Sequence, residues 1–400
     1  MVFFLIYTGA LALIYGYVGR RLTLPARPGR KGRIAFWSLT AFLFFLAPAS
    51  ILFEIYDLRF PGRPVLDWIG YLGLGYFTLA FSLLLIRDAG LLALWIGRAL
   101  PVVWRAWRPA RPDPDDPDDP PDPERRRFLL HSMNLGLAGL TGALSGYGLH
   151  QARRTPETME VTATLPNLPP AFEGFRLVQI SDLHVGPTVG RGFVEAVVKR
   201  VNALAADAVV FTGDLADGPV AELRPQVAPL AGLAAPAGRF FVTGNHEYYS
   251  GVGPWVDEAA RLGFTVLLNE HRVLERNGDR MVLAGVTDLN GGRFLAGHKS
   301  SPIKALADAP PGLTRILLAH QPASVFEAAA AGADLMLCGH THGGQYFPLN
   351  YLAYLAQPYV HGLHQYRNTL VYVSRGAGYW GPPLRLMAPS EITVITLRRG

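Results

Sequence analysis

Five short polar motifs in the second half of the chain, most of which follow an apolar run, constrain the fold more than any other feature. Apolar runs rich in β-branched residues are typical of buried strands. A fold built around them brings several strand ends to one edge of a sheet, where a site can form. Five of the 11 histidines lie in the motifs. The motifs are SDLH at 181–184, TGDL at 212–215, TGNHE at 243–247, LLAHQP around His320, and GHTHGG at 339–344.

The side chains in these motifs are of the kinds that bind metal ions. Asp182 and His184 are two residues apart, as are His340 and His342, and in extended backbone such pairs point the same way. Mixed oxygen and nitrogen donors without a thiolate favour Mn²⁺, Fe or Zn²⁺. Shared between two divalent ions, this set leaves coordination positions open, as catalysis requires. The candidate metal ligands are Asp182, His184, Asp214, Asn245, His320, His340 and His342.

The same ligand set predicts a reaction class. Two ions about 3.5–4 Å apart can share a bridging hydroxide and clamp both oxygens of an in-line phosphoryl displacement. Asp214 has two carboxylate oxygens and can bridge the ions. His246, next to Asn245, is the natural acid for the leaving alkoxide. We therefore expect a phosphohydrolase in which His246 and Asp214 are catalytic; no substrate-binding residue is assigned.

Residues 151–400 show the alternation of strands and helices that predicts parallel or mixed sheets covered by helices. Helical patterns fill 191–205 and 323–331. Cys338 ends an apolar run and is expected to be a buried small side chain. Strands are expected at 175–181, 208–212, 239–243, 281–286, 315–319, 334–338, 370–374 and 392–397.

The first 150 residues contain apolar runs long enough to cross a bilayer. We expect a transmembrane region at 1–108, with spans at 2–18, 34–53 and 68–86, and a fourth span within 125–150. Residues 91–108 contain Arg98 and Pro101 and are expected to be an interfacial or helix-extending segment. The alternative is a further span.

The acidic, proline-rich tract at 109–124 predicts an extended linker, because it contains seven acids and seven prolines and cannot form a packed core. The triplet that follows, in RRRFL at 125–129, resembles a twin-arginine export signal. The domain at 151–400 follows the fourth span.

The net charge of +6 comes mainly from the N-terminal part, so it indicates membrane topology rather than nucleic-acid binding. Six basic residues lie between the first two apolar runs and are expected on the cytoplasmic side. Four spans then place residues 151–400 outside the cytoplasm. A fifth span at 89–104 would reverse that side.

The five motifs together resemble the calcineurin-like metallophosphoesterase superfamily, whose pattern is DxH, GD, GNH[DE], H and GHxH. The resemblance covers roughly residues 155–400. It implies a four-layer α/β/β/α sandwich with a dinuclear site. The expected fold is therefore N-terminal transmembrane helices followed by this α/β sandwich. By this resemblance Asp182, His184, Asp214 and His342 hold one metal, Asp214, Asn245, His320 and His340 hold the other, and His246 lies near the leaving group.

The segments SDLHVGPTV, GHTHGGQ and SRGAGYWGPPLRL resemble the bacterial membrane-anchored branch of that superfamily. This branch includes cell-envelope phosphodiesterases and UDP-diacylglucosamine pyrophosphatases. We expect a multi-pass inner-membrane protein with an extracytoplasmic catalytic domain. Its partners would be the lipid bilayer and a phosphorylated, amphiphilic substrate with a phosphodiester or pyrophosphate bond. The alternatives are a cytoplasmic-face UDP-2,3-diacylglucosamine pyrophosphatase of lipid A synthesis and a non-catalytic membrane sensor.

Overall fold

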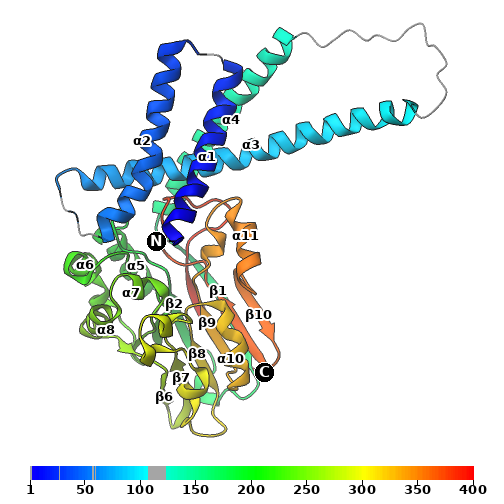
Figure 1. Ribbon diagram of the computed structural model, residues 1–400. Coiled ribbons are helices and arrows are strands. Elements are labelled where there is room, and N and C mark those ends of the chain that lie inside the picture. Colours follow the sequence, from blue (N-terminus) through cyan, green and yellow to red (C-terminus); the bar gives the residue numbers. More distant parts are fainter. Residues whose placement is uncertain (1, 27, 56–57, 59, 107–122) are drawn as a thin grey trace. The chain divides into compact units, whose positions relative to one another are not determined.

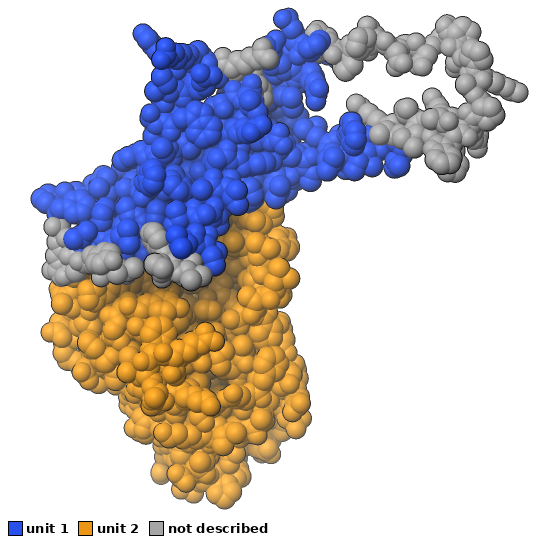
Figure 2. Space-filling model, viewed as in Figure 1, with its two compact units in different colours: residues 1–146 blue, residues 147–400 orange. Residues whose placement is uncertain are grey.

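The computed structural model describes residues 2–26, 28–55, 58, 60–106 and 123–400. The chain divides into two compact units, Met1–Gly146 and Tyr147–Gly400, which are coloured separately in Figure 2. The predicted linker at 109–124 lies outside the described residues, except for its last two residues, where a helix begins.

Among the described residues, four helices precede the first strand: α1 (Val2–Ala26), α2 (Arg30–Ile55), α3 (Arg63–Ala106) and α4 (Pro123–Arg153). The first three share a buried apolar cluster, in which the ring of Tyr15 stacks on that of Phe77 with centroids 4.0 Å apart. Their outward faces are also apolar, since Leu13 is 75% and Phe45 is 65% exposed. A helix that is apolar on all sides is typical of a membrane span.

Two segments among the described helices are long and apolar enough to cross a membrane, Arg30–Phe53 in α2 and Arg63–Gly97 in α3. They coincide with two of the four predicted spans. The runs at 2–18 and 125–149 are helical and lie within α1 and α4. Among the described residues, neither helix contains a segment that is long and apolar enough to count as a candidate span. Helix α3 continues without a break to Ala106, so most of the segment at 91–108 extends the preceding helix.

Several charged side chains in this unit are paired with one another. Asp88 of α3 lies 2.6 Å from Arg21 of α1 and 2.6 Å from its neighbour Arg87. The Asn134 amide of α4 donates to the backbone carbonyl of Arg21 at 2.7 Å. Pairing of this kind offsets the cost of placing charges among apolar helices.

The second unit contains two six-stranded mixed sheets. The first sheet runs in the order β1 (Glu157–Leu165), β12 (Glu391–Arg399), β2 (Arg176–Ile180), β3 (Ala208–Phe211), β4 (Arg239–Phe241) and β5 (Thr265–Val266). The second runs in the order β10 (Gly362–Tyr366), β11 (Thr369–Val373), β9 (Leu335–Cys338), β8 (Arg315–Leu318), β7 (Asp279–Gly285) and β6 (Glu270–Arg276). Antiparallel pairs are β12–β2, β10–β11 and β6–β7.

The two sheets pack face to face through a continuous apolar core that includes Val210, Phe240, Leu283 and Leu337. The outer face of the first sheet is covered by α5 (Arg191–Asn202), α6 (Val220–Val227) and α8 (Val252–Arg261). The outer face of the second is covered by α9 (Pro302–Leu306) and α10 (Val325–Ala330) (Figure 1). The predicted four-layer α/β/β/α sandwich is therefore confirmed.

Every predicted strand is present. Short runs such as AVVF in β3 and LMLC in β9 are buried along their whole length, as expected for central strands covered on both faces. Cys338 is a free, buried residue at the end of β9, as expected. The remaining short elements are α7 (Asn245–Tyr249), α11 (Leu349–Ala356), η1 (Pro170–Phe172), η2 (Ala228–Gly232), η3 (Gly291–Arg293), η4 (Ala296–His298), η5 (Pro322–Ser324) and η6 (His342–Gly344).

Candidate metal centre

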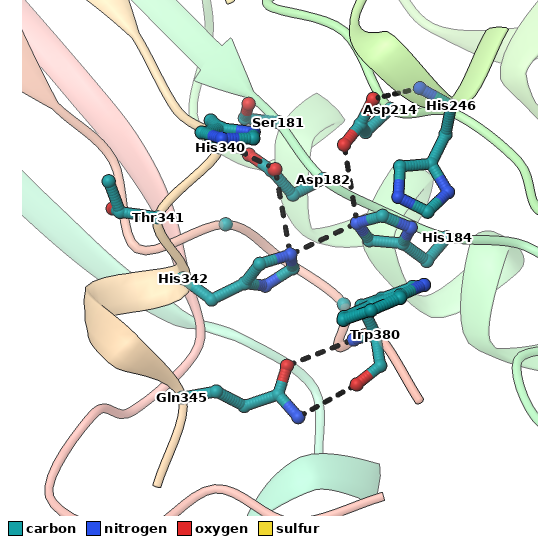
Figure 3. A network of polar contacts seen from close by, with 12 residues as sticks. Ser181, Asp182, His184, Asp214, His246, His340, Thr341, His342, Gln345 and Trp380 are labelled. Carbon is teal, nitrogen blue, oxygen red and sulfur yellow. Dashed lines mark hydrogen bonds and ion pairs between the residues drawn. The ribbon is translucent and has the colours of Figure 1, made fainter. Parts of the chain in front are cut away.

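The carboxyl ends of five strands from both sheets carry the five motifs to one place. Asp182 follows β2, Asp214 follows β3 and Asn245 opens α7 after β4. His320 follows β8 and His340 follows β9. Because these strands end at the same edge of the sandwich, the predicted ligands and His246 converge although the chain separates them by up to 160 residues. Figure 3 shows six of these residues, Asp182, His184, Asp214, His246, His340 and His342.

One group of potential ligands consists of Asp182, His184 and His342, which we call the first group. Their ligand atoms all lie within 4.8 Å of one another. The Nε2 atoms of His184 and His342 are 3.0 Å apart, and Oδ1 of Asp182 is 3.6 Å from Nε2 of His342. All three residues are buried.

The second group consists of Asp214, His320 and His340. Nε2 of His320 lies 3.1 Å from Oδ2 of Asp214 and 3.1 Å from Nδ1 of His340. Oδ1 of Asn245 lies 3.0 Å from the same nitrogen. Oδ2 of Asp214 is also 3.6 Å from Nε2 of His184. This carboxylate therefore stands between the two groups.

The surroundings of His320 show why a cation suits this place. Its Nδ1–H donates to the carbonyl of Thr212 at 2.8 Å, which leaves a lone pair on Nε2. That lone pair faces the acceptor oxygens of Asn245 and Asp214. Burial lowers the pKa of His320, but the Asp214 and Asp182 carboxylates raise it well above its usual range. A proton or a metal ion bound at Nε2 of His320 would remove the repulsion between these three acceptor atoms.

The spacing of the donors also fits metal binding. Imidazole and carboxylate atoms that bind one divalent ion at about 2.0–2.2 Å lie roughly 3 Å from one another. The contacts at 3.0–3.1 Å around His320, and the one at 3.0 Å between His184 and His342, have this spacing. The residues present therefore fit divalent ions in both groups, with oxygen and nitrogen donors only.

Outer partners hold two of the rings in the orientation that ligation requires. Nδ1 of His184 donates to Oδ1 of Asp217 at 2.8 Å, so its Nε2 lone pair faces inward. His342 differs, because Nη2 of the buried Arg385 donates to its Nδ1 at 3.0 Å. Burial and the Arg385 charge hold the pKa of His342 well below its usual range. The ring is thus neutral with its proton on Nε2, which donates to His184, and an ion bound at Nε2 would displace that proton.

The predicted acid, His246, lies beside both groups. Its backbone N–H donates to Oδ1 of Asp214 at 2.9 Å, and its Nδ1 is 2.7 Å from Oδ1 of Asp217. Burial lowers the pKa of His246, but the carboxylates of Asp214 and Asp217 raise it to about 9. The ring therefore holds a proton at neutral pH, as a general acid must.

Asp217 was not among the predicted residues, although one of its oxygens contacts both His184 and His246. Burial raises the pKa of Asp217, but these two rings hold it well below its usual range. The available signal was its place three residues after Asp214 in GDLAD. That spacing carries no information until the loop conformation is known.

The expectation that the DxH and HxH pairs are extended is wrong. Asp182, His184, Asp214, His340 and His342 all have φ between 50° and 72°. This left-handed region is costly for residues with a Cβ atom and is enriched at functional sites. The side chains converge because tight left-handed turns aim them inward, not because alternate residues of a strand share a face.

Residues 175–344 match the family described as calcineurin-like phosphoesterase. The Bacillus subtilis protein named "Uncharacterized metallophosphoesterase YkuE" is 34% identical over 286 residues, which are 68% of this chain and 97% of that relative. The chain belongs to the calcineurin-like metallophosphoesterases. The family and the name of this relative indicate metal-dependent phosphoester hydrolysis.

Two further metallophosphoesterases illustrate the range of the similarity. The Danio rerio "Transmembrane protein with metallophosphoesterase domain" is 41% identical over 269 residues, 65% of this chain and 61% of that relative. The Helicobacter pylori (strain ATCC 700392 / 26695) "Uncharacterized metallophosphoesterase" is 37% identical over 278 residues, 68% of this chain and 72% of that relative. The chain thus spans about three-fifths of the length of the Danio rerio protein. That relative's name and the apolar helices α2 and α3 agree with membrane association.

Glycines allow the metallophosphoesterase motifs to pack this closely. A Cβ atom on Gly244 would collide with Oδ1 of Asp214, and one on Gly339 would collide with Oδ2 of Asp182. The glycines of TGN and CGH are thus required because a carboxylate from a neighbouring loop occupies the space of their side chain. Neither has the positive φ that would otherwise explain a glycine.

Glu247 ties two of the motif loops together. Its buried carboxylate accepts hydrogen bonds from the backbone N–H groups of Asp214 (3.0 Å), Leu215 (2.7 Å) and Gly244 (2.6 Å). These donors would otherwise be unpaired in the interior. The final acid of GNHE is therefore a structural link between the loops that carry Asp214 and His246.

Exposed aromatic rings surround the predicted acid. The ring of His246 lies 5.2 Å from that of Tyr249 and 5.7 Å from that of Trp380, and Tyr249 contacts Phe294 at 5.8 Å. These three aromatic residues are 64%, 53% and 50% exposed, in the order named. Gln345 hydrogen-bonds both the backbone N–H (3.0 Å) and the carbonyl (2.9 Å) of Trp380. The centre thus opens beside a fixed aromatic rim.

Proposed function

We propose that this metallophosphoesterase uses two divalent ions to hydrolyse a phosphodiester or pyrophosphate bond in an amphiphilic, membrane-associated substrate. One observation carries the proposal: Asp214 stands between two complete ligand groups and contacts the predicted acid, His246. Such an arrangement is suited to an in-line phosphoryl displacement.

The ligand assignment follows the two groups. Asp182, His184 and His342 would hold one ion and His320, His340 and Asn245 the other, with Asp214 shared between them. When bound, the ions supply an activated water and neutralise charge on the phosphoryl oxygens. Mn²⁺, Fe and Zn²⁺ all suit these donors.

His246 would supply the proton that the departing oxygen takes up. Asp217 accepts from Nδ1 of this ring, so the second nitrogen, Nε2, carries the transferable proton. Asp214 holds the backbone of the same residue. The acid is therefore fixed at both its main chain and its ring, as proton transfer to a short-lived alkoxide requires.

Apolar surface beside the centre supports an amphiphilic substrate. Besides the aromatic rim, helix α11 follows Gln345 closely and has no charged residue and no buried residue. Its Tyr351 and Leu355 are 59% and 85% exposed. Apolar pocket walls with a few fixed polar groups are typical of sites for partly apolar ligands. An acyl or isoprenoid portion of the substrate would cover this surface.

The enzymatic part is tested with the full-length protein in detergent. Metal-stripped protein should be inactive on bis(p-nitrophenyl) phosphate and regain activity with Mn²⁺. Asp214→Asn should abolish that activity, whereas Asp257→Asn, an exposed carboxylate on α8, should not change it. Metal binding without hydrolysis of any phosphodiester or lipid pyrophosphate would favour a binding-only sensor.

We also propose that the catalytic domain lies outside the cytoplasm. The six basic residues between the first two apolar runs, and the arginine triplet near the start of α4, support this orientation. Protease added to intact spheroplasts should then cleave residues 151–400. Cleavage only after the spheroplasts are opened would place the domain in the cytoplasm, where a nucleotide-linked lipid such as UDP-2,3-diacylglucosamine is the better substrate candidate.

A further inference from the structure

Arg385 is the most deeply buried arginine beside the metal centre. It lies after β11 and is only 1% exposed, although arginine is rarely buried without a carboxylate partner. Its guanidinium donates instead to main-chain oxygens and to one imidazole. The accepting atoms are the carbonyls of His342, Arg375, Gly376, Gly378 and Ala388 and Nδ1 of His342.

On one side, the guanidinium fixes His342 at two points. Nη1 donates to the carbonyl of His342 at 2.7 Å, and Nη2 donates to the ring Nδ1 at 3.0 Å. The first contact holds the backbone of a residue in the left-handed region (φ 51°). The second holds the ring so that Nε2 faces His184. Together they set both the position and the direction of this side chain.

On the other side, the guanidinium holds the segment that supports Asp182. It donates to the carbonyls of Gly376 and Gly378, whose segment contacts the DxH loop directly. The Gly378 N–H donates to the carbonyl of Asp182 at 2.9 Å. A Cβ atom on Gly376 would lie 2.7 Å from Cβ of Asp182. One side chain therefore connects two loops of the first group.

Arginine is suited to this task in a way that lysine is not. Its planar guanidinium presents five N–H donors in a rigid fork, whereas a lysine ammonium is a point charge with three donors. Arg385 uses Nε and both Nη atoms. A lysine could reach one of the two loops but could not hold both in fixed register.

We propose that Arg385 is a positioning residue for the ion that Asp182, His184 and His342 would hold. It orients His342 and the loop of Asp182 without touching ion or substrate. The inference rests on the proposed two-ion function. It concerns the first group only, since none of the guanidinium's hydrogen bonds goes to Asp214, His320 or His340.

The test is a calorimetric titration of the metal-stripped, full-length protein with Mn²⁺. The unsubstituted protein should bind two ions. Arg385→Lys should bind one of them about 10- to 100-fold more weakly, the usual effect of losing a ligand's supporting partner, and the other unchanged. Combining Arg385→Lys with His320→Ala should remove tight binding altogether. Arg224→Lys, in a half-exposed ion pair with Glu258, is the matched control.

Each outcome is decisive. If the unsubstituted protein binds fewer than two ions, the two-ion function itself fails. If it binds two and Arg385→Lys binds both with unchanged affinity, the positioning role is overturned while the function stands. Arg385→Gln, which keeps two N–H donors without charge, should show the same selective loss. If neither variant folds, as followed by circular dichroism, Arg385 is a core residue and the positioning role is also overturned.

Discussion

The backbone N–H of His246 donates to Oδ1 of Asp214 at 2.9 Å, so the predicted acid is anchored to the carboxylate that stands between the two ligand groups. Any shift of Asp214 therefore moves ligands and acid together. Gly244 lies in the loop of His246 and packs against Asp214, so a substitution there can produce such a shift.

Gly244→Ala should lower kcat about 100-fold, because its new Cβ atom would collide with Oδ1 of Asp214 and a displacement of about 1 Å can cost that much. The φ of Gly244 is −95°, so alanine adds no backbone strain. Gly253→Ala is the control, since its Cβ atom would meet nothing within 4 Å. Wild-type kcat in Gly244→Ala would show that the loops relax freely.

Asp217→Asn should impair hydrolysis most when the leaving group is a poor one. The substitution removes the charge that holds Nδ1–H of His246, and general acids contribute about 10²- to 10⁴-fold. Rates are compared for a p-nitrophenyl diester, whose leaving group needs little help, and for an alkyl diester. An equal loss for both substrates would contradict the acid role and point to His184 alone.

His340→Gly should be more stable than His340→Ala in the metal-free protein, by about 1 kcal/mol. Both variants lose the ring, but the alanine keeps a Cβ atom at φ 72°. Denaturant unfolding measures the difference. Equal stabilities would mean that the left-handed backbone at this position carries no strain.

Removal of metal should lower the unfolding temperature, because the buried carboxylates of Asp182 and Asp214 then lose their cation. At a free Mn²⁺ concentration 100 times its dissociation constant, the restored stability is about 2.7 kcal/mol per site. Differential scanning calorimetry with and without a chelator measures it. Asp214→Asn should show a smaller gain on adding Mn²⁺, and a gain equal to that of the unsubstituted protein would count against the shared ligand.

Trp380→Ala should lower kcat/KM about tenfold for an acyl-chain phosphodiester, which corresponds to about 1.4 kcal/mol, and leave a small water-soluble diester unaffected. The side chain is 53% exposed and lies beside His246. Phe326→Ala, an exposed aromatic on α10, is the control. Equal effects on both substrates would show that the aromatic rim does not determine the preference for an acyl-chain substrate.

The sequence predicts the ligands because their residue types and spacing are local, and the fold brings all of them together. Asp217 and Arg385 could not be found in this way. Arg385 follows His342 by 43 residues, and only the packing of the segment after β11 onto the centre reveals its contacts. The backbone of the ligands was misjudged because alternation alone does not distinguish a strand from a left-handed turn.

The strands that were missed have a common cause. In β6 (EHRVLER) and β10 (GLHQY), buried or half-buried positions are interrupted by charged or polar ones, and both strands lie at sheet edges. Apolar runs mark central strands but not edges that water reaches on one face. In the N-terminal unit, apolar length predicted four spans; among the described residues, segments of α2 and α3 are long and apolar enough to cross a membrane.

Both ligand groups draw on both sheets of the sandwich. Asp182 and His184 follow β2 of one sheet, and His342 follows β9 of the other; Asp214 follows β3, and His320 follows β8. Neither group is assembled until the two sheets have packed together. Each bound ion would therefore connect the two sheets at their shared edge. Metal supply would then govern maturation as well as turnover, since chains made without metal would leave the sandwich free to open at that edge.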